Sequence, residues 1–136
     1  MQTLLEQLFP NVMASPDKFW ESVWATVVMT GWAGALMFVI GLCLGLLMVV
    51  LKPGGILACP VVYQILDKLV NLIRSIPFVI LIALLMYVTK AIMGTRIGIR
   101  GVIVPLVVGS APFFSRQVEA ALSDIPAGLV EAAKAM

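Results

Sequence analysis

The chain has 136 residues, of which 62% are hydrophobic and 12% charged, and its formal net charge is +2. This composition lies outside the range of soluble globular domains and predicts a surface that mostly contacts lipid. So small a net charge gives no support for binding nucleic acid. The sequence has no histidine, which is the commonest metal ligand and general base, and no cluster of acidic residues. It also has no P-loop with which to bind a nucleotide. We therefore expect no enzyme active site and no cofactor bound by this chain.

The first long apolar run predicts the first membrane span. Residues 1–21 mix apolar, acidic and proline residues, which favours a short helix before Pro10, then a turn. Pro16 is suited to the opening turn of the helix that follows. Residues 22–51 carry no charge and exceed the roughly twenty residues that cross a hydrocarbon core of about 30 Å. We expect a tilted or projecting span over 22–51, ended sharply by Lys52-Pro53-Gly54-Gly55.

Glycines are spaced along this span at helical intervals. Gly41 and Gly45 form a GxxxG pattern, and Gly34 lies seven residues before Gly41. Small residues on one face let a second helix approach closely. We interpret Gly41 and Gly45 as a helix-packing face, with incidental glycines as the alternative.

A second span is predicted over residues 69–89, after a polar loop that includes Asp67 and Lys68. The span has to include Arg74 near one end to be long enough, with the guanidinium reaching back to the membrane interface. Pro77 predicts a kink in its first turns.

The third predicted span covers residues 99–120 and contains Pro105 and Pro112. Two prolines leave backbone carbonyls without helical partners, which is tolerable only against other helices or a water-lined cavity. This span is therefore our candidate for the wall of a transport pathway. No residue identifies a substrate-binding site.

The tail, residues 123–136, is polar where it begins and rich in helix-forming residues where it ends. Pro126 is acceptable early in a helix, and the run from Glu131 to Met136 has high helix propensity. A helix starting near Asp124 would have its free N–H groups capped by that side chain. The residues alone leave two readings open, a docking segment for a partner protein and an ordinary exposed connector helix.

Three stretches resemble one family of membrane proteins. The string Ile125-Pro126-Ala127-Gly128-Leu129-Val130-Glu131-Ala132-Ala133-Lys134-Ala135-Met136 resembles the start of the cytoplasmic EAA loop in permease subunits of ABC importers. Arg74-Ser75-Ile76-Pro77-Phe78 is similar to the R-x-x-P stretch that opens a span in amino-acid permeases. The segments Gly94-Thr95-Arg96-Ile97-Gly98, Val102-Ile103-Val104-Pro105-Leu106 and Gly109-Ser110-Ala111-Pro112-Phe113 resemble the methionine-importer branch. The likeness runs from about Ser22 to the last residue.

The resemblance implies an all-α, polytopic permease of a bacterial cytoplasmic (inner) membrane that imports methionine. Its partners would be a second copy of the permease, an extracytoplasmic binding protein and cytoplasmic ATPase subunits that hold ATP and Mg. The residues implied in docking the ATPase are Pro126, Gly128, Glu131, Ala132, Ala133 and Lys134. Positive charges divide five against four between the two sides and do not decide the orientation. The resemblance implies an extracytoplasmic segment over 1–21 and a cytoplasmic coupling segment over 123–136.

The family pattern is E-A-A, then three residues, then a glycine, which would stand one position beyond Met136. Members of this branch usually have five spans, whereas three are predicted over 22–136. We therefore expect a truncated permease or a fragment of one. Two alternatives stay open, a permease for another amino acid or small nutrient and a three-span scaffold or channel subunit without an ATPase.

Overall fold

The computed structural model describes residue 4 and residues 7–136, and every regular element in this part of the chain is an α-helix. The helices are α2 (Pro10–Ala14), α3 (Pro16–Leu51), α4 (Pro60–Ser75), α5 (Phe78–Met93), α6 (Gly98–Ser123) and α7 (Ala127–Ala135). Two of them, α3 and α6, are each long and apolar enough to cross a membrane. The helices α4 and α5 meet this criterion only as a bent pair, which forms either a broken third span or a re-entrant loop. The predicted all-α, polytopic membrane fold is confirmed.

The bounds of the first long helix follow from its prolines and glycines. Helix α3 begins at Pro16, as predicted, and ends at Leu51, directly before the predicted breaker sequence. Gly54 has a φ of 85°, a left-handed conformation that glycine adopts without steric cost. The turn predicted after Pro10 is wrong, because Pro10–Ala14 forms the short helix α2. The helix predicted before Pro10 falls largely outside the described residues.

The second span differs from the prediction in two ways. The polar loop predicted through Asp67 and Lys68 is wrong, since these residues lie within α4. The continuous span over 69–89 is also wrong, because the chain bends by 110° between α4 and α5. Pro77 accounts for this break, which is larger than the predicted kink. Proline disfavours helical geometry in the residue before it, and Ile76 is extended, with φ −81° and ψ 123°.

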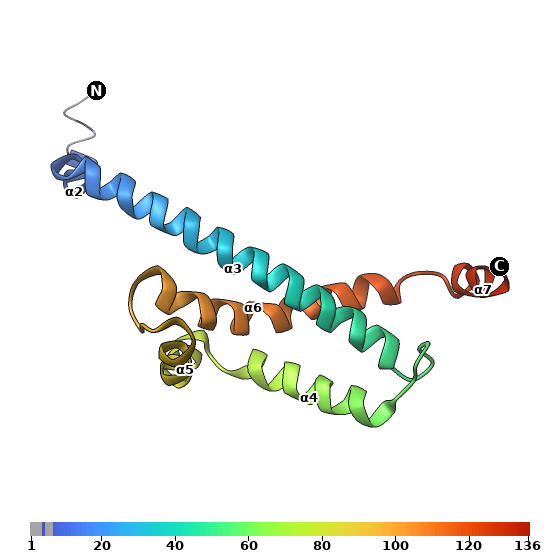
Figure 1. Cartoon of the computed structure of the whole chain (residues 1–136). Coiled ribbons are helices and arrows are strands. Elements are labelled where there is room, and N and C mark those ends of the chain that lie inside the picture. Colours follow the sequence, from blue (N-terminus) through green and yellow to red (C-terminus); the bar gives the residue numbers. More distant parts are fainter. Residues whose placement is uncertain (1–3, 5–6) are drawn as a thin grey trace.

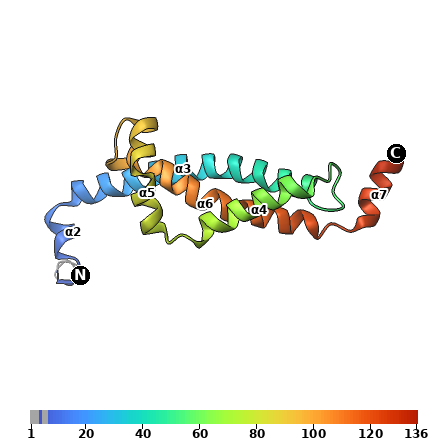
Figure 2. The ribbon, with the colours of Figure 1, turned by 90° about the horizontal axis from the view of Figure 1, so that it is seen from below.

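The helices α3 and α6 lie side by side and run in the same direction (Figures 1 and 2). Helix α4 returns along them in the opposite direction, and α5 then crosses near the start of α6. The connection between α3 and α4 lies at the same end of the molecule as α7. This arrangement places the predicted coupling segment beyond the end of α6.

The helices α3 and α6 approach each other closely at the GxxxG pattern. A Cβ atom added at Gly41 would meet Phe114 Cδ1 at 2.8 Å, and one added at Gly45 would meet the Ser115 carbonyl oxygen at 2.7 Å. Both distances are shorter than van der Waals contact allows, so only glycine permits the observed separation of α3 and α6. Gly34 has nothing within 4 Å of such a Cβ and takes no part in the contact.

Substituting Gly45 by valine in a complete permease should therefore separate α3 from α6. Overpacking of this kind costs about 1–3 kcal/mol, which should lower the thermal denaturation midpoint of the detergent-purified protein. Gly34→Val adds the same side chain to the same helix at an open position and is the matched control. Equal midpoints for the two variants would contradict the assigned contact.

Candidate functional site

Helix α7 contains most of the residues that, by the resemblance, would dock the ATPase. It runs from Ala127 to Ala135 and has no buried residue. Pro126 is its N-cap, with φ −56° and ψ 132°, so it turns the chain into the helix from outside. The other five residues, Gly128, Glu131, Ala132, Ala133 and Lys134, lie within α7. The structure therefore gathers the predicted docking residues on one short, exposed helix.

Asp124 does not cap this helix. It is the C-cap of α6, and its backbone N–H donates to the Ala120 carbonyl oxygen at 3.1 Å. The prediction that its side chain caps the coupling helix is wrong, because α7 starts three residues later than assumed. Residues 124–126 instead form the link between α6 and α7.

The end of α6 is joined to the end of α3. Lys52 Nζ donates a hydrogen bond to Ser123 Oγ at 2.8 Å. Beside this contact lies a cavity of about 400 Å³, lined from one side by the α3–α4 connection and from the other by Val130, Glu131 and Lys134 of α7. The first connection and the coupling segment thus share one end of the molecule.

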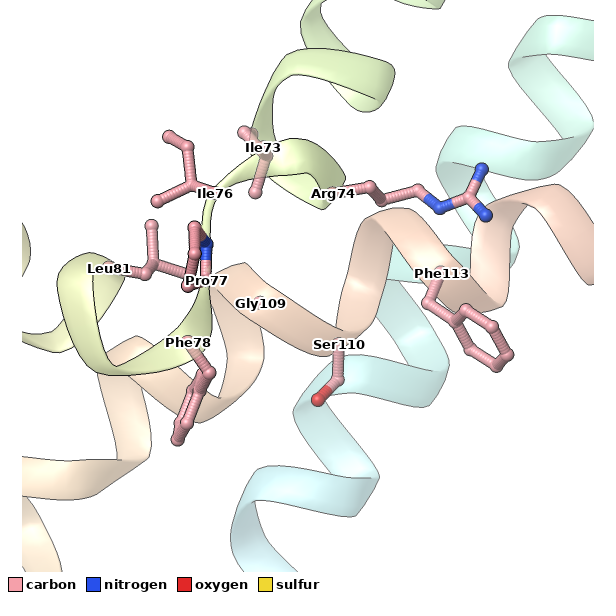
Figure 3. A pocket seen from close by; sticks show the side chains of 9 residues that line it. All are labelled: Ile73, Arg74, Ile76, Pro77, Phe78, Leu81, Gly109, Ser110 and Phe113. Atoms are coloured by element: carbon pink, nitrogen blue, oxygen red, sulfur yellow. The ribbon is translucent and has the colours of Figure 1, made fainter.

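Arg74 and Pro77 lie beside a second cavity, of about 540 Å³, where α4 breaks into α5 (Figure 3). The opposite wall is formed by Gly109, Ser110 and Phe113 of α6. The Arg74 guanidinium carbon lies 5.9 Å from the centroid of the Phe113 ring. The structure places this guanidinium against the side of α6, and its position at the membrane interface stays a prediction.

The two prolines of α6 are buried between helices. Pro112 lies beside Ala111, whose carbonyl oxygen is 3.0 Å from the ideal Cβ position of Gly41. The buried Ser115 hydroxyl donates to the Pro112 carbonyl oxygen at 2.8 Å. Pro105 is also fully buried. Within the described residues both prolines serve packing, and their role as the wall of a pathway stays a prediction.

The structure reveals a polar cluster that the sequence reasoning missed. Arg116 of α6 forms ion pairs with Asp67 of α4 and, at 2.7 Å, with Glu119 of α6. The Tyr63 hydroxyl of α4 donates to the other Glu119 oxygen at 2.8 Å, and Arg116 Nη2 donates to Asn71 Oδ1 at 3.2 Å. The signal available in the sequence was the four-residue spacing of Tyr63, Asp67 and Asn71, which places all three on one helix face.

This cluster should stabilise the packing of α4 against α6. Asp67→Asn in a complete permease is expected to lower the free energy of unfolding by about 1–3 kcal/mol, which is less than the cost at a fully buried pair, because Asp67 keeps 33% of its side chain exposed. Lys68→Gln, on the exposed face of the same helix turn, is the control. A double-mutant cycle with Arg116→Gln should give a non-additive loss, and strict additivity would contradict the pairing.

Known proteins match this chain closely in sequence and structure. The family described as binding-protein-dependent transport system inner membrane component matches residues 41–136. The D-methionine transport system permease protein MetI of Yersinia pestis is 51% identical over 116 residues, which are 85% of this chain and 54% of that protein. The methionine import system permease protein MetP of Bacillus subtilis is 41% identical over 133 residues, 98% of this chain and 59% of that protein.

A solved structure agrees with these relatives. A structure of inward-facing conformations of the MetNI methionine ABC transporter matches with a TM-score of 0.80 and 49% identity, over 84% of this chain and 53% of that one. The chain spans somewhat more than half the length of the relatives it matches. Because the family match covers most of the chain, this protein belongs to the binding-protein-dependent transport system inner membrane components.

Proposed function

We propose that this chain forms part of the membrane channel of an ATP-driven importer whose substrate is methionine. The observation that carries the proposal is the 51% identity to the MetI permease of Yersinia pestis over 85% of this chain. The MetP permease of Bacillus subtilis, also named for methionine import, supports the same substrate at 41% identity. The subunit itself would be no enzyme, since ATP and Mg would bind a separate ATPase.

In this proposal α7 is the contact with the cytoplasmic ATPase. Its exposed side chains include Leu129 and Val130, at 64% and 40% exposure, beside the small residues Ala132 and Ala133. Small side chains let a partner approach the helix backbone closely, and the apolar ones give it surface to bury. The end of the molecule that carries α7 would then be cytoplasmic, and the N-terminus extracytoplasmic.

The geometry supports a route by which the ATPase moves the channel. A displacement of α7 would pass through residues 124–126 to α6, and from α6 to α3 through the contact at Gly41 and Gly45. The Arg116 cluster would carry it to α4. ATP must bind one arrangement of the assembly better than the other for this motion to do work. A second copy of the permease and an extracytoplasmic binding protein would complete the importer.

The test is Ala133→Asp in a complete permease expressed with its ATPase. A carboxylate on the small-residue face of α7 should sharply reduce co-purification of the ATPase and methionine uptake, while the permease remains at normal levels in the membrane. Ala58→Asp is the matched control, because Ala58 is an exposed alanine in the α3–α4 connection at the same end of the molecule. Normal ATPase assembly and uptake with Ala133→Asp would overturn the docking role of α7.

A further inference from the structure

Most of the side chains that line the cavity at the break between α4 and α5 are apolar. Its lining side chains belong to Pro77, Phe78, Leu81, Phe113 and other apolar residues, with Arg74 and Ser110 as the polar exceptions. Figure 3 shows Arg74 reaching from α4 along α6 toward Phe113. The volume of about 540 Å³ falls in the range of about 300–1,000 Å³ that is typical of small-molecule sites.

This cavity lies deeper along α6 than the polar cluster. Arg116 and Glu119 occupy the last turns of α6, whereas Gly109 and Phe113 precede them by one to two turns and lie near the middle of the helix. Arg74, which contacts this level, is therefore further from the end that carries α7 than Arg116 is. Arg74 lies within the bent pair α4 and α5, which together are apolar enough to cross a membrane, and an arginine inside such a segment typically marks a functional site.

The two arginines differ in their partners. Arg116 is held by two carboxylates. Among residues 7–136, no carboxylate lies within ion-pair distance of Arg74, whose guanidinium instead lies over the Phe113 ring. A cation–π contact at this distance uses none of the in-plane N–H donors of the guanidinium, which stay available to an anion. The anion that arginine binds best through two parallel hydrogen bonds is a carboxylate or a phosphate.

The remaining walls point to the rest of the ligand. Phe78 and Leu81 of α5 and Phe113 of α6 offer apolar and aromatic surface to the cavity. A thioether packs favourably against aromatic rings, and an aliphatic side chain gains by leaving water. No acidic side chain lines the cavity, so it does not favour a substrate with a cationic side chain.

We propose that this cavity holds the substrate amino acid in transit, with the Arg74 guanidinium binding its carboxylate and Phe78 and Phe113 contacting its apolar side chain. The inference rests on the proposed import function and adds a site within the membrane. Arg74 is then a substrate-binding residue, and the break at Pro77 is what opens room beside it.

The first experiment measures methionine uptake in vesicles that contain the complete permease, its ATPase and its binding protein. Arg74→Gln should lower uptake about tenfold, equivalent to about 1.4 kcal/mol, with ATPase assembly unchanged. Arg74→Lys keeps the charge but loses the planar fork and should fall between. Arg96→Gln is the matched control, because Arg96 also lies over an aromatic ring, 4.7 Å from the Tyr87 centroid, and this variant should stay within about twofold.

Two outcomes separate this inference from the proposed function. If the unaltered importer takes up methionine and Arg74→Gln does not change the uptake rate, the cavity is not a substrate site. The assignment as an importer then still holds. An unaltered importer that takes up no methionine overturns both.

A second measurement tests the proposal if the Arg74→Gln protein does not assemble with its ATPase. Ser110→Cys, in protein whose Cys43 and Cys59 are replaced by alanine, keeps Arg74 and both phenylalanines and places a thiol in the cavity wall. Methionine should slow modification of this thiol by a maleimide in phosphatidylcholine nanodiscs. A labelling rate that methionine does not change overturns the proposal. A labelling rate that is slowed only by adding phosphatidylglycerol also overturns it, in favour of a lipid phosphate bound at Arg74.

Discussion

The close approach of α3 and α6 is the contact on which the rest of the structure depends. At Gly41 and Gly45 the two backbones lie nearer than any side chain on α3 would allow, and lipid offers no hydrophobic force to bring them together. Van der Waals contacts between the closely packed helices have to supply the attraction instead. With α3 fixed along α6, most other elements are positioned by α6: α4 and α5 pack on it, α4 also contacts α3, and α7 extends from the end of α6.

The middle of the chain is held by a different kind of force. Helix α4 is amphipathic and carries Tyr63 and Asp67 on the side that faces Arg116 and Glu119. Ion pairs and hydrogen bonds therefore attach α4, whereas glycine contacts attach α3. Polar attachments between helices are directional, so they fix the rotation of α4 about its axis. That rotation sets the direction in which Arg74, two turns beyond Asp67, extends along α6.

Sequence reasoning succeeded where the information is local and failed where it is not. An uncharged run ended by proline and glycine predicted α3, an apolar run with two internal prolines predicted α6, and the GxxxG spacing predicted the face of α3 that packs. The polar residues of α4 were interpreted as a loop, because their partners on α6 lie some 50 positions away in the chain. Pro77 was expected to kink a helix, but a complete break also requires α6 to support both halves. The cavity at Arg74 depends on Phe113 in another helix, and the single sequence contains no signal for that pairing.

The division between glycine-packed and charge-paired helices also bears on how the protein enters the membrane during synthesis. Helix α3 is long and apolar enough to leave the translocation machinery for lipid by itself, whereas α4 and α5 qualify only as a bent pair. The charged face of α4 is neutralised by residues that the ribosome adds about fifty positions later. Until Arg116 emerges, α4 has to be shielded by water or by the insertion machinery. Integration of the middle of this chain should therefore depend on Arg116, and a nascent chain that stalls before it leaves Asp67 without its ion-pair partner.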